Sequence, residues 1–132
     1  MDVRLATVCD YAMVSQEGKL SLLGMFDQIN PPKLPFVFPQ LFLVTVFEAP
    51  SVEAGSTKEV RFILDGEDGD PVLTIDQLVH VPQAPVRGQP IVMNNVLGLG
   101  GIEFRQPGAY AFHILVGGDE RARVPLKVNK PK

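Results

Sequence analysis

Apolar and polar residues alternate along most of this chain, in short runs that end at glycine or proline. The clearest run, from 109 to 116, has a large apolar residue at every second position, namely Tyr110, Phe112, Ile114 and Val116. A period of two places successive side chains on opposite faces of a strand, so that one face can be buried. No longer stretch shows the period of an α-helix. The pattern therefore predicts an all-β protein.

Nine segments with alternating or solidly apolar character can be delimited in this way. They are Val3–Cys9, Lys19–Ile29, Gln40–Ala49, Lys58–Asp65, Val72–Val81, Ile91–Leu99, Ile102–Arg105, Ala109–Val116 and Ala122–Val128. The chain has 132 residues, of which 45% are hydrophobic, so it can bury a core without a disulfide. We expect residues 1–132 to form one domain, a two-sheet antiparallel β-sandwich of immunoglobulin-like or Greek-key type with about nine strands.

Proline and glycine mark the expected connections. Asn30–Pro39 contains four prolines and Pro82–Pro90 contains three. Because proline donates no backbone hydrogen bond, we expect Asn30–Pro39 to be an extended crossover between the sheets and Pro82–Pro90 to be a second connection. Asp68-Gly69 and Gly117-Gly118 are typical of hairpin turns, where positive φ is required. The glycines between 98 and 101 predict a turn or bulge that separates two strands, since no helix follows them to form a phosphate-binding loop.

Charge and cysteine content narrow the possible partners and the compartment. Twelve Lys and Arg against fifteen Asp and Glu give a formal net charge of −3, spread without blocks of one sign. Phosphate binding depends on clustered basic residues, so we do not expect a nucleic-acid partner. Apolar runs such as 41–47 are far shorter than the roughly 20 residues of a membrane helix, so we expect no membrane partner. A single cysteine and no signal peptide at the start predict a cytoplasmic protein.

The residues available for catalysis are few. An activated nucleophile needs a neighbouring base, and the chain offers only His80, His113 and the thiol of Cys9. Cys9 lies on the face of an apolar segment and is better explained as a buried structural thiol. His113 interrupts an apolar strand, where a hydrogen-bonded or exposed histidine is the simpler explanation. We therefore expect no enzymatic activity and no cofactor.

Two sets of polar residues are candidates for binding. Asp10 and Tyr11 lie at a strand end, and Asn94 and Asn95 lie inside an apolar strand. A purely structural design would place residues of high β-propensity there, so we take these four as a candidate contact patch. The alternative is that the asparagines satisfy backbone groups and Tyr11 caps the core.

The densest acidic stretch is a candidate metal site. It comprises Asp65, Glu67, Asp68 and Asp70, whose carboxylates suit Ca²⁺, which accepts loose oxygen geometry. The stretch does not follow the EF-hand pattern, so a solvated hairpin tip is the alternative.

Three stretches resemble a known family: CDYAMVSQEGKLSLLGMFDQI, FVFPQLFLVTVFEA and RQPGAYAFHILVGGDERARVPLKV. They resemble an uncharacterised family of small bacterial all-β proteins, nearly from end to end. The resemblance implies a stand-alone protein of this length and supplies no activity or catalytic residue. The last hairpin also resembles the pattern of many immunoglobulin-like sandwiches, at the level of fold only.

A well-specified β fold with few catalytic groups favours a non-enzymatic protein-binding or scaffold module, with homo-oligomer formation left open. Such a module would use a sheet face, a loop end or an exposed strand edge, and its partner would be another protein or a second copy. A small-ligand or calcium-binding sandwich is the alternative.

Overall fold

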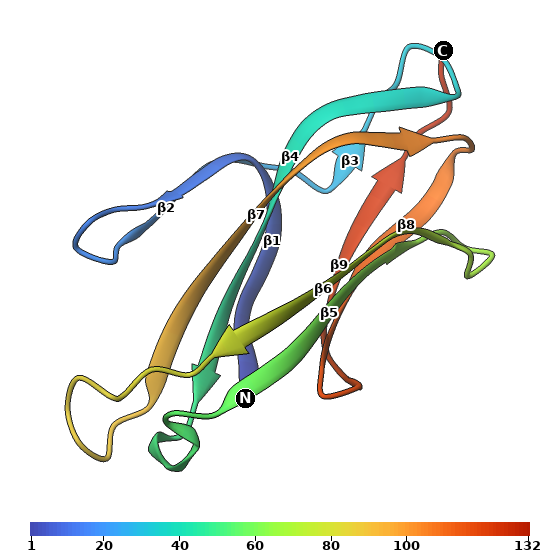
Figure 1. Ribbon diagram of the computed structural model, residues 1–132. Helices are drawn as coiled ribbons and strands as arrows, with labels where there is room; N and C mark the ends of the chain where they lie inside the picture. Colours follow the sequence, from blue (N-terminus) through green and yellow to red (C-terminus); the bar gives the residue numbers. More distant parts are fainter.

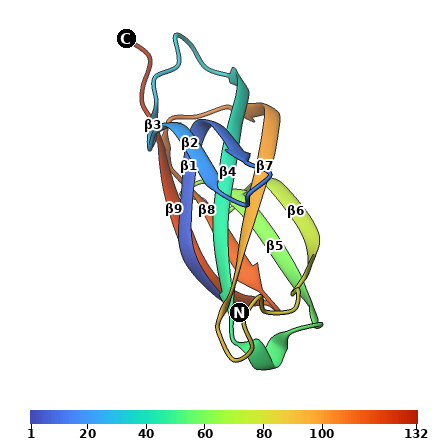
Figure 2. The same cartoon turned by 90° about the vertical axis from the view of Figure 1, so that its left-hand side faces the viewer.

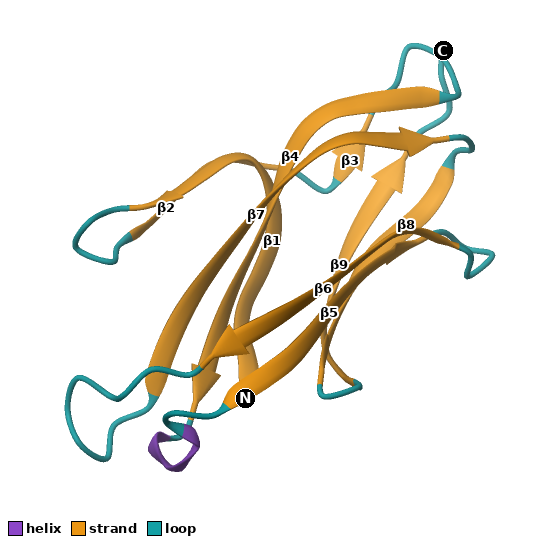
Figure 3. Cartoon of the chain, viewed as in Figure 1, coloured by secondary structure: helices purple, strands orange, loops and turns teal.

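The computed structural model describes all residues from Met1 to Lys132 and contains nine β-strands. The strands are β1 (Asp2–Val14), β2 (Leu20–Met25), β3 (Gln28–Ile29), β4 (Phe36–Ala49), β5 (Thr57–Asp65), β6 (Pro71–His80), β7 (Ile91–Phe104), β8 (Gly108–Val116) and β9 (Asp119–Val128). One turn of 3-10 helix, Ser51–Glu53, follows β4 (Figure 3). Nothing helical in the protein is long and apolar enough to cross a membrane.

The strands form two separate sheets that pack face to face (Figures 1 and 2). The first sheet has four strands in the order β2-β1-β4-β7, and the second has five in the order β3-β9-β8-β5-β6. The predicted all-β, two-sheet architecture with about nine strands is therefore confirmed. The two proline-rich connections carry the chain from the second sheet to the first, as expected for the one between β3 and β4 and also for the one between β6 and β7.

The main core lies between the sheets. Alternate residues of β4 face those of β5, β8 and β9, as the period of two predicts. The largest side chains with almost no exposed surface are Phe47, Phe62, Phe104, Phe112, Leu41, Leu43 and Leu64. Burial of this apolar surface is the main favourable term in holding the sheets together.

Two predicted strand boundaries were wrong. In the structure two predicted strands are joined and another is divided, so the number of strands is still nine. Ile91–Leu99 and Ile102–Arg105 are one strand, β7, because the ladder with β4 continues through Gly98 and Gly100 and skips only Gly101. The segment Lys19–Ile29 is instead split into β2 and β3. The end of the first proline-rich segment also differs, since β4 begins at Phe36 and includes Pro39. The ladder tolerates Pro39 because neither this proline nor Gly101, which lies opposite it with φ +69°, takes part in the pairing of β4 with β7.

One strand pair departs from the expected antiparallel arrangement. The two residues of β3, Gln28 and Ile29, pair in parallel with Lys127 and Val128 of β9. The pair covers only the end of β9, and Pro125 stands in the part that β3 does not reach. A proline on such an edge discourages further pairing.

The β1–β2 hairpin bends over the outer face of the first sheet. Asn94 Nδ2 on β7 donates a hydrogen bond of 3.2 Å to the carbonyl oxygen of Gly18, in the turn of the hairpin. Cys9 and Ala12 of β1 form a small second core with Val44 of β4. The bend requires a glycine at 24, because φ is +68° and a Cβ there would lie 2.3 Å from Oδ2 of Asp10.

A tyrosine fixes the connection between β7 and β8. The hydroxyl of Tyr110, near the start of β8, donates a hydrogen bond of 2.7 Å to the carbonyl oxygen of Gln106. A backward hydrogen bond of this kind is the tyrosine corner of immunoglobulin-like sandwiches. The immunoglobulin-like type of this sandwich stays a prediction.

Candidate functional site

A cleft of about 920 Å³ opens between the edges of the two sheets. One wall is the end of β7, from Gly98 to Glu103, and the other is the β5–β6 turn with the start of β6, from Gly66 to Leu73. Each of these strands is the last in its sheet, so the cleft lies where the sandwich is not closed. A hydrogen bond joins Asn95 of β7 to Gln77 of β6. From the C-terminal end of β6 the two strands diverge toward the β5–β6 turn (Figure 1).

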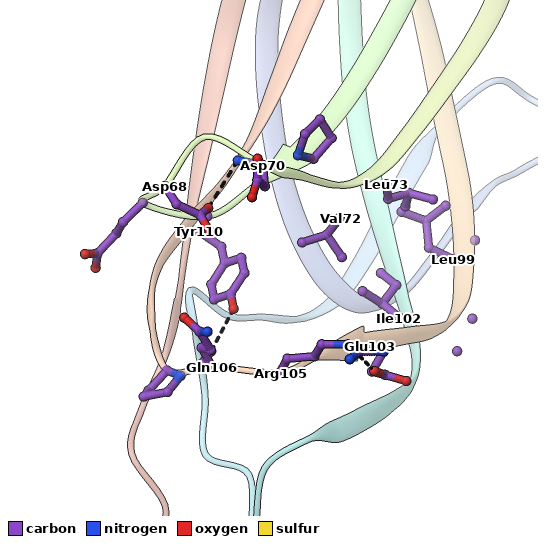
Figure 4. Close-up of a pocket in the computed structure, with 17 residues that line it drawn as sticks. Asp68, Asp70, Val72, Leu73, Leu99, Ile102, Glu103, Arg105, Gln106 and Tyr110 are labelled. Atoms are coloured by element: carbon purple, nitrogen blue, oxygen red, sulfur yellow. Dashed lines mark hydrogen bonds and ion pairs between the residues drawn. The ribbon is translucent and has the colours of Figure 1, made fainter.

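Apolar side chains form the floor of the cleft. Leu99 and Ile102 of β7 belong to the main core and are buried, while Leu73 of β6 is half-buried and packs against the same core. Val72 is 39% exposed and lies in front of them (Figure 4). The floor is therefore the rim of the hydrophobic core, which the two edge strands leave open to solvent.

The β5–β6 turn places acidic residues on one wall. Gly69 has φ +81°, and Asp68 Oδ1 accepts a hydrogen bond of 3.1 Å from the backbone N–H of Asp70. Glu67 Oε1 accepts a hydrogen bond of 2.7 Å from the backbone N–H of Ala109, so this carboxylate ties the turn to β8. The carboxylate of Asp70 has no hydrogen-bond partner and is exposed.

The β7 side of the cleft carries an ion pair, and a buried tyrosine of β8 lies beside Gly66 of the β5–β6 turn. Arg105 Nε and Glu103 Oε1 are 2.8 Å apart, on side chains that are 81% and 43% exposed (Figure 4). Tyr110 packs edge-on against Phe104, with ring centroids 5.1 Å apart. Burial raises the pKa of the Tyr110 hydroxyl, and the negative charges of Asp68 and Glu67 raise it further. The cleft therefore has an acidic character.

The wall formed by β7 is largely bare backbone. Gly98, Gly100 and Gly101 present no side chains there and are all exposed. On its other side β7 is hydrogen-bonded to β4 along its whole length, and no strand pairs with it on the cleft side. An edge strand leaves alternate N–H and C=O groups free for a further strand. This unpaired backbone is the chemically distinctive feature of the cleft.

The candidate contact patch proposed from the sequence does not form one cluster. Asn95 Nδ2 donates a hydrogen bond of 2.7 Å to Gln77 Oε1 of β6, beside the cleft. Asn94 points to the opposite side and holds the β1–β2 hairpin. Asp10 and Tyr11 lie on that hairpin and are exposed, and the ring of Tyr11 stands edge-on to Phe42 at 5.4 Å. The two asparagines thus have structural partners.

The four proposed metal ligands are directed to different partners. Asp65 Oδ1 lies 2.9 Å from Nε2 of His113, Glu67 binds the backbone of β8, and Asp68 closes its own turn. No group of three or more His, Cys, Asp or Glu side chains converges in the protein. Only Asp68 and Asp70, with Glu67, line the cleft, and they do so as an acidic wall.

Of the three side chains considered for catalysis, two are held by hydrogen bonds within the fold and one is exposed. The Cys9 thiol is buried and donates a hydrogen bond of 3.3 Å to the carbonyl oxygen of Tyr11, and burial raises its pKa. His113 is bonded through Nε2 to Asp65 and through Nδ1 to Glu120. Burial opposes protonation of His113, but the two carboxylates outweigh it and raise its pKa. His80 ends β6 and is exposed.

Sequence reasoning missed the residues that make the cleft. Leu73, Leu99 and Ile102 lie in apolar segments that carry no mark of a site, and the glycines of β7 predicted a turn. An edge position depends on strand order, which alternation along the chain does not encode. One signal was present: β7 carries three glycines where a buried central strand would carry side chains.

The sequence matches no curated protein. Among solved structures, one that is similar is the Pseudomonas fluorescens alkylpurine DNA glycosylase AlkC bound to DNA containing an abasic site analog. The TM-score is 0.48 and the identity 12%; the similar region covers 94% of this chain and 30% of the glycosylase. This chain thus spans about 30% of that protein's length.

This match corrects one expectation about partners. We expected a protein partner or self-association and excluded nucleic acid, whereas the similar solved structure is of a protein bound to DNA, so the exclusion is withdrawn. Its basis was also too weak physically, because a formal net charge of −3 describes the whole chain and not one surface.

The resemblance to an uncharacterised family of small all-β proteins is confirmed. Residues 4–129 match a family of unknown function (DUF6941), and the match runs through all nine strands. This chain therefore belongs to the family of unknown function DUF6941.

Proposed function

We propose that this chain is a non-enzymatic binding module that takes an extended polypeptide segment into the cleft, where the segment adds a strand to β7. The observation that carries this proposal is the open edge of β7 between Gly98 and Ile102, which faces the cleft as unpaired backbone. Strand addition of this kind gains affinity from main-chain hydrogen bonds and specificity from alternate side chains.

The dimensions of the cleft support a strand as its occupant. At a rise of about 3.4 Å per residue, the stretch from Gly98 to Glu103 offers roughly 17 Å of edge, enough to pair with about five residues. The volume of about 920 Å³ lies at the upper end of the range for ligand sites. The apolar floor at Leu73, Leu99 and Ile102 would receive every second side chain of the added strand.

The edge of β7 suits this role better than the facing edge of β6. The part of β6 that lines the cleft begins with Pro71, which has no N–H to donate. In β7 there is no proline between Ile91 and Phe104, and the only charged residue is Glu103. Proteins that protect an edge strand place proline or charge on it, and β7 carries almost neither.

The surroundings of the reactive side chains support a role without catalysis. A nucleophile would need a base within hydrogen-bond reach, yet Cys9 bonds to a backbone carbonyl and both ring nitrogens of His113 are held by carboxylates. Neither residue lines the cleft.

Selection from a displayed library of random peptides of roughly ten residues tests the proposal. Peptides enriched on the wild type should lose at least about tenfold in affinity on Val72→Trp, which fills the mouth of the cleft with an exposed indole. The matched control is Val86→Trp in the exposed β6–β7 connection, where Val86 is 54% exposed and the substitution should leave affinity unchanged. Failure to enrich any peptide, or equal binding to both variants, would overturn the proposal.

A further inference from the structure

We infer that the segment bound in the cleft is basic, with Lys or Arg beside the apolar residues that enter the floor. This inference rests on the proposed function and names the chemical class of the partner. It follows from the distribution of charge around the cleft, which is uneven although the chain as a whole is only mildly acidic.

Four carboxylates and one guanidinium line the cleft. The carboxylates belong to Glu67, Asp68, Asp70 and Glu103, and the guanidinium belongs to Arg105. Their formal net charge of −3 equals that of the entire chain, so the rest of the molecule has as many acidic as basic residues. The excess negative charge of the protein is therefore gathered at this one cleft, where low-dielectric walls focus its field.

The protein itself neutralises little of this charge. Arg105 pairs with Glu103, and Glu67 accepts one backbone hydrogen bond, but Asp68 and Asp70 face no cation. The other ion pairs, such as Arg61 with Asp76 and His113 with Asp65, lie outside the cleft. Asp68 and Asp70 stand on the turn above the apolar floor (Figure 4), where cationic groups of a bound segment can reach them.

The cleft offers different surroundings to different side chains of a bound segment. Along an added strand, every second side chain turns toward Leu73, Leu99 and Ile102, and the alternate ones turn toward solvent. Asp68 and Asp70 on the β5–β6 turn and Glu103 on β7 stand on opposite walls of the cleft, at the end away from the Asn95–Gln77 hydrogen bond, so the residues of a segment at that end meet all three carboxylates. An apolar segment with basic residues at this end is complementary to the arrangement, whereas an acidic segment is repelled by it.

The test compares the composition of peptides enriched on the wild type with that of peptides enriched on Asp70→Asn/Glu103→Gln. Both residues are exposed and Asp70 bonds only through its backbone, so the double variant should fold. Lys and Arg should be enriched, and Asp and Glu depleted, on the wild type and much less so on the variant. The control, Asp27→Asn/Asp119→Asn, removes two exposed carboxylates outside the cleft and should enrich the same basic peptides.

Affinities of single enriched peptides give a second readout. Fluorescence anisotropy should show binding weakened by about 3- to 10-fold in Asp70→Asn/Glu103→Gln and by added salt, as for exposed charge pairs. Cleft-specific peptides without basic bias would overturn this inference and leave the proposed function standing. If the enriched peptides bind the wild type and Val72→Trp with equal affinity, the proposed function itself is wrong. Displacement of the peptide by a single-stranded oligonucleotide, or by self-association of the protein, would also overturn the inference.

Discussion

Asn95 on β7 and Gln77 on β6 join the edges of the two sheets by a side-chain hydrogen bond of 2.7 Å. Beyond this bond the edges separate and the cleft begins. Both side chains are half-buried, so water can replace the bond only in part. The pair therefore sets the inner end of the cleft.

Removal of this bond should destabilise the protein moderately. We expect Asn95→Ala and Gln77→Ala each to lower the free energy of unfolding by about 0.5–1.5 kcal/mol, the usual net value of one hydrogen bond. In a double-mutant cycle by urea unfolding, the second substitution should then cost less than it does alone, because the partner is already gone. Fully additive effects would mean that the bond contributes nothing.

Thr45 should be replaceable by valine without loss of stability. Its hydroxyl is buried, with 1% of the residue exposed, and Oγ1 has no hydrogen-bond partner. Because an unsatisfied buried polar group costs about 1–3 kcal/mol, Thr45→Val should leave the free energy of unfolding unchanged or raise it. The reverse change, Val44→Thr at a fully buried site, should lower it. A clear loss of stability in Thr45→Val would show that the hydroxyl has a partner.

His113 should make stability depend on pH. Two carboxylates, Glu120 and Asp65, raise its pKa in the folded state despite partial burial. The imidazolium can donate to both carboxylates, but neutral imidazole can donate to only one. The resulting stabilisation is complete below the unfolded pKa of about 6.5 and is lost as pH rises through the folded pKa.

Thermal unfolding across the neutral pH range and an NMR titration of the imidazole measure this effect. Glu120→Gln should lower the pKa of His113 and flatten the pH dependence, because it removes one of the two negative partners. His113→Gln should abolish this component. A wild-type His113 that titrates below its ordinary pKa would contradict the geometry.

Tyr110→Phe should weaken the connection between β7 and β8. The substitution removes the hydroxyl that donates to Gln106 and keeps the edge-on contact of the ring with Phe104. We expect the free energy of unfolding to fall by about 1 kcal/mol, the net value of one hydrogen bond. Chemical denaturation provides the measurement, and Tyr11→Phe, on a half-exposed ring whose hydroxyl has no partner, is the control. Equal effects of the two substitutions would count against a tyrosine corner.

The local pattern of residues predicted the hairpins well. The β5–β6 and β8–β9 turns fall at Asp68-Gly69 and Gly117-Gly118, where all three glycines have positive φ. These turns depend on backbone conformation within a few residues, which the sequence states directly. The alternation in β8 likewise predicted which side chains enter the core.

The cleft could not be predicted because it depends on which strands become neighbours. The glycines of β7 looked like a break, since only the partner strand β4 shows that the ladder continues through them. The acidic stretch from Asp65 to Asp70 was noticed, but not the different partners of its carboxylates. Asp65 pairs with His113, Glu67 binds the backbone of Ala109, and Asp68 and Asp70 line the cleft, and these contacts are made with residues far along the chain. Asn95 was noticed without its partner Gln77, which belongs to the other sheet.

Addition of a strand to β7 in the cleft is the central feature of the proposed binding mode. NMR measurement of scalar couplings across hydrogen bonds between labelled protein and a bound, enriched peptide tests it directly. We predict couplings between peptide backbone groups and alternate residues of β7 from Gly98 to Ile102, with the β4–β7 ladder unchanged. A peptide whose contacts lie on the β1–β2 hairpin or the outer face of the second sheet, without hydrogen bonds to β7, would contradict the claim.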